Sequence, residues 1–153
     1  AVISKINGFC FTGGLELALA ADLIYIANEA KLGDTHAILG FRPSWGLTQR
    51  LPKYIGIARA KELSFTAKTI SGIQAVEYGI ALEAFPINEL DSRVNEIAIK
   101  ISQNSPNSIK AYKDLYLAAS NKGLTEGLKY EANTSYDIPE VKERVQEFLK
   151  KLR

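Results

Sequence analysis

A glycine-rich turn that leads directly into an apolar helix limits the possible folds of this chain more than any other part of its sequence. A β-branched, apolar run over residues 2–6 predicts a strand, and Asn7-Gly8 ends it. Thr12-Gly13-Gly14 then precede residues 15–21, which are rich in leucine and alanine and predict a helix. The first N–H groups of a helix have no partner within it. Together with the positive end of the helix dipole, they favour an anion or an oxyanion at this turn.

Glu16 is the one acidic residue within this apolar helix. Burying a carboxylate is costly unless a partner or a reaction uses it. Two interpretations follow from the residues alone. In the first, residues 2–21 form a buried strand, turn and helix, and Glu16 only favours the helix dipole. In the second, the turn is an oxyanion hole and Glu16 is an acid or base beside it.

The composition is that of an ordinary globular protein with one core. The chain has 153 residues, of which 46% are hydrophobic and 24% are charged. A net charge of +2 gives no support to a nucleic-acid or membrane-surface role, and no apolar run is long enough to span a bilayer. The single cysteine, Cys10, is expected to be buried and reduced, which indicates a reducing compartment. Because the chain begins at Ala1 within an expected core strand, we expect a further segment to precede it.

Strands are predicted near the N-terminus and helices over the rest of the chain. Residues 22–27 predict a buried strand, and Lys31-Leu32 predict a short one. A long loop over residues 33–46 follows, and such loops often carry function; it holds the only histidine, His36, and the only tryptophan, Trp45. A last short strand is predicted over residues 80–85. Helices are predicted over residues 46–55 with an interruption at Pro52, and over residues 57–65, 71–78, 88–101, 108–119, 125–134 and 139–152.

Three of these helices carry more specific expectations. Ser71 and Gly79 are expected to cap the helix over residues 71–78. Asn88 or its neighbour is expected to cap the helix over residues 88–101. Four apolar side chains of the helix over residues 108–119 are expected to face inward: Ile109, Tyr112, Leu115 and Tyr116.

The order of these motifs resembles the crotonase family, which is the enoyl-CoA hydratase/isomerase superfamily. The resemblance rests on Ile6-Asn7-Gly8, a gap of three residues, and then Thr12-Gly13-Gly14 and Leu15-Glu16-Leu17-Ala18. Further matches follow in order over residues 30–33, 40–43, 46–52, 56–63 and 75–80. The resemblance implies an α/β fold with a crotonase-like (ClpP/crotonase) spiral of ββα units. Residues 1–85 are similar to the second half of that spiral, and residues 86–153 to the helical region that packs in the oligomer.

The resemblance implies an enoyl-CoA hydratase-like lyase of fatty-acid or acyl-CoA metabolism, which adds water to a trans-2-enoyl-CoA thioester. Gly13 matches one of the two backbone N–H donors of the family's oxyanion hole, and the other donor belongs to the half of the fold that this chain does not include. Glu16 matches the carboxylate that activates the water. No cofactor is implied, because coenzyme A is part of the substrate, and no metal site is expected.

His36 departs from the family's pattern. Hydratases of the family carry a second glutamate here, whereas this chain reads Asp34-Thr35-His36-Ala37, as some other members do. The imidazole would replace the second carboxylate as the proton donor to the α-carbon, or the change marks another reaction or a loss of activity. Asp34 either orients the ring or is simply a turn residue.

Four further residues match substrate-binding positions of the family. The backbone N–H near Ser44 would hold the water, and Trp45 either lines the acyl pocket or is packing. Phe148 and Lys151 lie in a segment whose lysine contacts the nucleotide phosphate of coenzyme A, often from a neighbouring subunit. Lys151 is otherwise an exposed lysine that favours a helix dipole.

Two alternatives remain open beside the hydratase. One is double-bond isomerisation, which ranks lower because isomerases rely on the second carboxylate. The other is a truncated, non-catalytic chain that packs into an oligomer through its helices. The resemblance further implies a homotrimer or a dimer of trimers that is intracellular, in the cytoplasm or an organelle matrix. Leu152-Arg153 is not a peroxisomal signal.

Overall fold

The computed structural model of the chain describes residues 1–151. Contacts between residues divide the chain into two units, Val2–Ala98 and a second unit that begins at Ile99. The boundary between these two units lies within a helix, α5 (Ile87–Ser102). This is because the first turns of α5 pack on the first unit, as the burial of Leu90 and Val94 shows.

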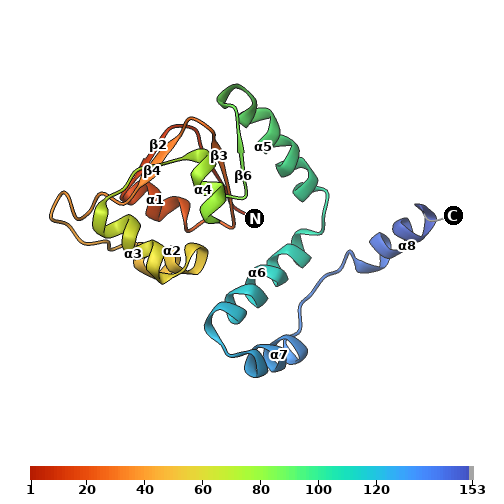
Figure 1. Cartoon of the computed structure of the whole chain (residues 1–153). Coiled ribbons are helices and arrows are strands. Elements are labelled where there is room, and N and C mark those ends of the chain that lie inside the picture. The colour runs from red at the N-terminus through yellow and green to blue at the C-terminus, as the bar shows by residue number, and fades with distance from the viewer. Residues whose placement is uncertain (152–153) are drawn as a thin grey trace. The chain divides into compact units, whose positions relative to one another are not determined.

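Two three-stranded sheets form the centre of the first unit (Figure 1). The first sheet has the order β1-β3-β6 and is parallel throughout; its strands are β1 (Ile3–Ile6), β3 (Leu23–Ala27) and β6 (Glu83–Phe85). The second sheet has the order β2-β4-β5; its strands are β2 (Phe9–Phe11), β4 (Lys31–Gly33) and β5 (Ile70–Ser71). Strand β2 pairs parallel to β4, which pairs antiparallel to β5. Strands β1 to β4 therefore alternate between the two sheets, in keeping with the expected ββα spiral, and β5 then pairs with β4 in the second sheet.

Four short helices and the start of α5 surround these sheets. They are α1 (Gly13–Ala18), α2 (Leu47–Ile55), α3 (Ile57–Thr66) and α4 (Gly72–Tyr78). The expected caps of α4 are confirmed, since Ser71 Oγ accepts the N–H of Gln74 and Gly79 adopts a left-handed φ of 85°. The Gln74 side chain in turn accepts the N–H of Ser71, so the pair forms a capping box.

Four local predictions for this unit are wrong. Helix α1 ends at Ala18, because the backbone must turn so that Asp22 and Leu23 can donate to the carbonyl of Val2 at the start of the β1–β3 pairing. Pro52 lies inside α2 without interrupting it, since buried Leu47 and Leu51 anchor that helix in the core.

The other two errors concern the start of α5 and the strand before it. Asn88 lies inside the helix, so it is not the cap. The carbonyl of Pro86 instead accepts the N–H groups of Glu89 and Leu90. The strand before it is also shorter than the predicted 80–85, because Ile80 and Ala81 donate to the carbonyl of Ala75 in the turn after α4.

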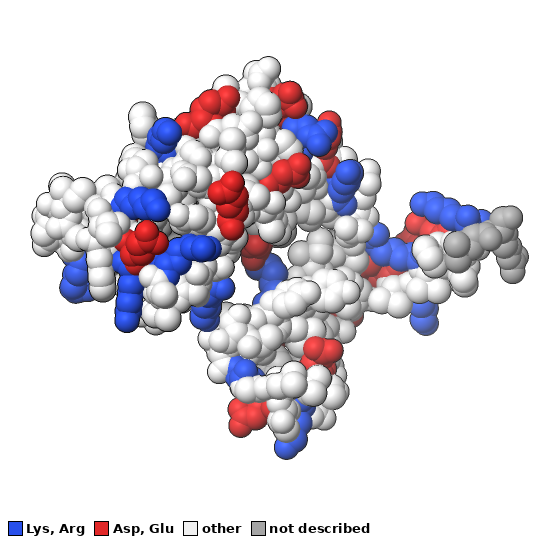
Figure 2. Space-filling view, in the orientation of Figure 1, with Lys and Arg blue, Asp and Glu red and all other residues white. Residues whose placement is uncertain are grey.

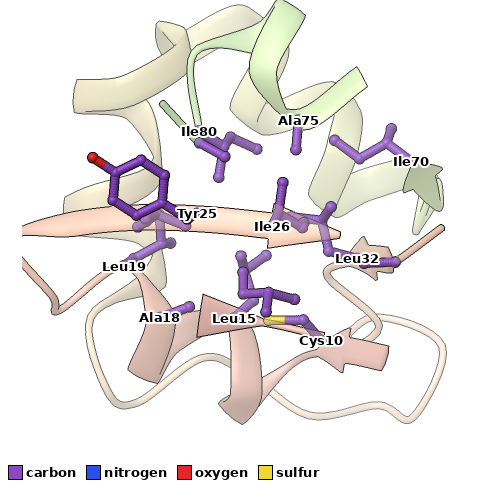
Figure 3. Close-up of a cluster of buried hydrophobic side chains, with 14 of the residues drawn as sticks. Cys10, Leu15, Ala18, Leu19, Tyr25, Ile26, Leu32, Ile70, Ala75 and Ile80 are labelled. Carbon is purple, nitrogen blue, oxygen red and sulfur yellow. The ribbon is translucent and has the colours of Figure 1, made fainter. Parts of the chain in front are cut away.

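One hydrophobic core holds the first unit together (Figure 3). Strand β3 crosses the middle of this core, with Leu15 and Ala18 of α1 on one side and Ala75 of α4 on the other. Leu15 and Ile26 are 0% exposed. Burying a side chain of this size stabilises the folded state by roughly 1.5–3 kcal/mol. The core thus fixes α1, and with it the residues that follow the glycine turn.

The second unit contains the end of α5 and three further helices: α6 (Pro106–Asn121), α7 (Leu124–Asn133) and α8 (Val141–Lys151). Among its described residues only Ser105 and Ala111 are buried. The prediction that Tyr112 and Tyr116 face inward is wrong, because they are 59% and 73% exposed. No helix within residues 1–151 combines the length and the apolar character that crossing a membrane needs.

Candidate active site

Thr12, the residue directly before α1, has an unusual backbone conformation. Thr12 has φ 46° and ψ −114°, a region that is sterically strained for a residue with a side chain. Its N–H donates to the carbonyl of Gly33 at the end of β4 (3.2 Å), and its own carbonyl accepts the N–H of Glu16 (3.0 Å). Gly13 is the first residue of α1 and comes before Glu16, whose N–H makes this bond to Thr12. The N–H of Gly13 therefore has no acceptor within the helix.

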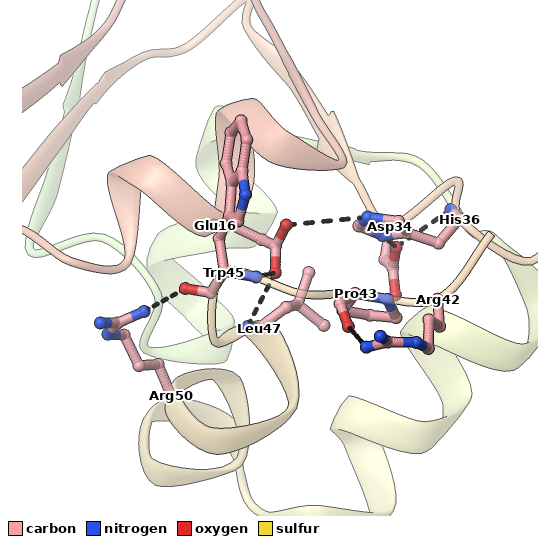
Figure 4. Close-up of polar contacts among 8 residues, drawn as sticks. All are labelled: Glu16, Asp34, His36, Arg42, Pro43, Trp45, Leu47 and Arg50. Atoms are coloured by element: carbon pink, nitrogen blue, oxygen red, sulfur yellow. Dashed lines mark hydrogen bonds and ion pairs between the residues drawn. The ribbon is translucent and has the colours of Figure 1, made fainter.

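Glu16 lies on the buried face of α1 and is only 2% exposed. Its Oε1 accepts two backbone hydrogen bonds, from the N–H of Trp45 (2.8 Å) and from that of Leu47 (3.2 Å) (Figure 4). Such bonds offset the loss of water around a buried carboxylate. They also use one oxygen for anchoring and leave the other, Oε2, for a different contact.

That contact is His36, the loop histidine (Figure 4). Its Nε2 lies 3.7 Å from Glu16 Oε2, and its Nδ1 lies 2.6 Å from Asp34 Oδ1. The backbone N–H of His36 donates to the same Asp34 oxygen (3.1 Å). His36 is 8% exposed and Asp34 is 2% exposed. The structure therefore brings together two carboxylates and one imidazole in a buried row, Asp34–His36–Glu16.

Close packing between two backbone segments positions Asp34, the first residue of this row. Gly33 ends β4 directly before Asp34, and a side chain at Gly33 would meet the carbonyl oxygen of Lys68 at 2.7 Å. Only glycine lets the two backbones approach so closely. The sequence identified Asp34 either as a residue that orients the ring or as a turn residue. The structure shows that one oxygen, Asp34 Oδ1, contacts both Nδ1 of the His36 ring and the backbone N–H of His36.

Trp45 is held from both sides of its backbone. Its N–H donates to Glu16, and its carbonyl accepts a hydrogen bond from Arg50 Nη1 (2.6 Å). The indole lies against the glycine turn, since a Cβ on Gly13 would be 3.1 Å from the ring carbon Cζ3. The ring is nevertheless 67% exposed, so it borders the turn and Glu16 on the solvent side. Ser44, also exposed, precedes it in the same loop.

The other two predicted binding residues, Phe148 and Lys151, lie in α8 of the second unit, where both are exposed. Two contributors were missed by the sequence, the N–H of Leu47 and the side chain of Arg50. Both lie in the matched segment over residues 46–52, which was the available signal, but a backbone contact to a residue 31 positions away has no mark in the sequence.

The single cysteine does not add a reactive thiol to this row. Burial raises the pKa of the Cys10 thiol to about 11, so it stays protonated near neutral pH and is a poor nucleophile. Within residues 1–151, no cluster of three or more His, Cys, Asp or Glu side chains is arranged to hold a metal ion. The site thus holds the buried row Asp34–His36–Glu16 beside the backbone N–H groups at the start of α1.

Comparisons with known proteins agree with this geometry. A family model described as enoyl-CoA hydratase/isomerase matches residues 1–153. The chain is 37% identical over 128 residues to the carnitinyl-CoA dehydratase of Proteus mirabilis (strain HI4320), a match over 84% of this chain and 49% of that protein. A solved enoyl-CoA hydratase from Bacillus anthracis is 36% identical and superposes with a TM-score of 0.90, over 97% of this chain and 59% of that one.

A second solved structure gives the same result. The enoyl-CoA hydratase of Mycobacterium paratuberculosis is 36% identical with a TM-score of 0.75, over 85% of this chain and 59% of that chain. The chain belongs to the enoyl-CoA hydratase/isomerase family, the crotonase family that its motifs resemble. It spans about half the length of the curated relatives it matches.

Proposed function

We propose that the whole protein is an enoyl-CoA hydratase-like lyase that adds water to a trans-2-enoyl-CoA thioester. The observation that carries this proposal is the buried pair in which Glu16 Oε2 and His36 Nε2 lie 3.7 Å apart. Hydration needs one group that takes a proton from water and a second that gives a proton to carbon. Glu16 and His36 are able to supply these two roles from neighbouring atoms.

The proposed reaction balances within this pair. Glu16 Oε2 takes a proton from a water molecule while the water oxygen bonds to the β-carbon, and the π electrons move to the thioester as an enolate. The N–H of Gly13 donates to the enolate oxygen, and losing one such donor typically costs about 2.7–4 kcal/mol of barrier. Protonated His36 gives its Nε2 proton to the α-carbon, which yields a 3-hydroxyacyl-CoA. The proton on Glu16 then passes to His36, which restores both groups.

The remaining residues are assigned to substrate binding. The N–H near Ser44 holds the water, and Trp45 borders the acyl chain, in keeping with its exposed ring beside Gly13. Phe148 and Lys151 contact the coenzyme A portion, with Lys151 placed against a phosphate. The reaction needs no cofactor, because coenzyme A is part of the substrate. Dehydration of a 3-hydroxyacyl-CoA is the reverse reaction and uses the same groups, and relatives named carnitinyl-CoA dehydratase favour it as a second activity.

The test is hydration of crotonyl-CoA by the whole protein, followed as loss of the enoyl absorbance. We expect Glu16→Gln and His36→Ala each to lower kcat by about 10²- to 10⁴-fold, the usual contribution of general acid–base catalysis. Exposed Glu29 provides the matched control, and Glu29→Gln should retain the activity of the parent.

Three outcomes separate the alternatives. Activity that is indifferent to Glu16→Gln rejects the assignment of the base. A parent that binds acyl-CoA and moves a double bond but adds no water is an isomerase. A parent that neither binds nor converts acyl-CoA, yet assembles with copies of itself, is a non-catalytic oligomer-forming chain.

A homotrimer or a dimer of trimers is the assembly we propose for the protein, within the cytoplasm or an organelle matrix. The support is that α7 and α8 bury no side chain while Leu124, Leu128 and Phe148 are exposed. On the face shown in Figure 2, Lys and Arg side chains are interspersed with Asp and Glu rather than gathered in one patch, which does not favour nucleic acid. Light scattering of the whole protein measures the assembly directly.

A further inference from the structure

Asp34 makes two contacts to His36 through a single oxygen. Its Oδ1 lies 2.6 Å from Nδ1 of the ring and 3.1 Å from the backbone N of the same residue. We propose that Asp34 is a positioning residue of the proposed hydratase site: it keeps the proton of His36 on Nδ1, so that Nε2 faces Glu16 as the nitrogen that gives and receives the proton of the reaction. This inference rests on the proposed function.

The proton position follows from the chemistry of the two atoms. An ionised carboxylate oxygen only accepts hydrogen bonds, so a ring nitrogen at 2.6 Å from it must be the donor. Asp34 is 2% exposed, and therefore little water competes for this oxygen. In the neutral ring, Nδ1 then carries the hydrogen and Nε2 carries the lone pair.

The Nε2 side of the ring is arranged for proton transfer with Glu16 rather than for a fixed hydrogen bond. Glu16 Oε2 lies 3.7 Å from Nε2, which is longer than a hydrogen bond, so no direct bond fixes this oxygen. Among residues 1–151, Glu16 and Asp34 are the only carboxylates within 4.0 Å of the ring nitrogens. One carboxylate therefore holds the ring and the other exchanges protons with it.

The opposite tautomer would damage the site. With its hydrogen on Nε2, a neutral His36 could not take back a proton from Glu16 at that nitrogen after the reaction. The lone pair on its Nδ1 would also face the carboxylate oxygen of Asp34. Asp34 thus acts on the reaction without touching the substrate.

Two variants separate the positioning contact from a simple turn. Asp34→Asn keeps an Oδ1 acceptor, and the backbone N–H of His36 orients the amide so that this oxygen faces the ring. Asp34→Leu has a similar size but no acceptor. The matched control is the pair of the same substitutions at Asp137, which is exposed.

The direct readout is the ¹⁵N spectrum of histidine-labelled whole protein, recorded at a pH where the ring is neutral. The signals of His36 are those absent from His36→Ala. We expect the proton on Nδ1 in the parent and in Asp34→Asn, and on Nε2 in Asp34→Leu. Asp34→Leu should also lose about 10- to 100-fold in kcat, by analogy with the loss seen when the hydrogen-bond partner of a metal-binding histidine is removed. KM should stay near that of the parent, and Asp34→Asn should restore most of kcat.

The outcomes decide the proposal separately from the proposed function. A parent whose neutral His36 carries its proton on Nε2 overturns the proposal, and so does an Asp34→Leu protein with unchanged kcat. If Asp34→Leu does not fold, the tautomers of the parent and of Asp34→Asn decide. A parent without hydratase activity whose His36 shows the expected tautomers overturns the proposed function, while the control of the ring by Asp34 is supported.

Discussion

The two units of this chain hold their helices in place by different means. The first unit, Val2–Ala98, buries a continuous apolar core around β3, in which Leu15, Ile26 and Leu32 have no exposed surface. The second unit, from Ile99 onward, buries only Ser105 and Ala111 among its described residues. Burial of apolar side chains is the main favourable term in folding, so the first unit has its own source of stability and the second has much less.

Polar contacts to acidic residues take the place of a core in the second unit. Tyr130 and Tyr136 both donate to Asp114 Oδ2, at 2.8 Å and 2.6 Å. Ser105 and Asn107 both donate to the carboxylate of Glu140. Such bonds are directional, so they fix which segments meet. Each adds little to the free energy of unfolding, because water competes for the same groups. The buried row Asp34–His36–Glu16 is accordingly found in the unit with the core.

Truncating a side chain within that core should have the greatest effect on stability. Ile26→Ala should lower the free energy of unfolding of the first unit by about 2–5 kcal/mol, because a fully buried side chain is lost and a cavity remains. The matched control is Leu117→Ala on α6, where the side chain is 62% exposed; it should change stability by less than about 0.5 kcal/mol. Denaturant titration with hydrogen exchange of the β3 and α6 amides measures both. Equal losses at the two positions would show that the contrast between the units is wrong.

A smaller effect is expected from the tyrosine contacts of the second unit. Tyr136→Phe removes one donor to Asp114, and should raise amide exchange around residues 134–137 while β3 exchange stays unchanged. Tyr112→Phe is the control, since that side chain is 59% exposed and lies on the same helix as Asp114. The same contact raises the pKa of Tyr136 to about 12, chiefly through its hydrogen bond to Asp114. An unshifted ultraviolet titration of Tyr136 would contradict the contact.

The smallest effect is expected from acid acting on Glu140. Hydrogen bonds from Ser105, and then from Asn107, lower the pKa of Glu140 to about 2 from the ordinary 4.5. Because the folded value is the lower one, this contribution is present above pH 4.5 and is lost as the pH falls toward about 2. Amide exchange at residues 105–108 should rise over that range in the parent, and Glu140→Gln should remove the pH dependence. Glu143→Gln, an exposed neighbour, should behave as the parent does; a pH dependence that persists in Glu140→Gln would assign it to another group.

Much of the fold was predictable because its signals are local. The β-branched run of β1, the glycines before α1 and the caps of α4 each act over a few residues, and the structure confirms them. The short strands β2 and β5 were not predicted. Their three and two residues are too few to show a period, and they exist because β4 lies between them.

The amino-acid sequence was enough to assign the family, and it supplied Glu16 and His36 as candidates for acid–base chemistry, because motif order and residue type are properties of the chain alone. How these residues meet depends on the tertiary fold. Folding of the loop brings the N–H groups of Trp45 and Leu47 to one oxygen of Glu16, and turns Nε2 of His36 toward the other. It also ends α1 early and leaves Tyr112 exposed. The physical reason is that a buried carboxylate and an apolar side chain both take their environment from packing between distant segments, which no local pattern records.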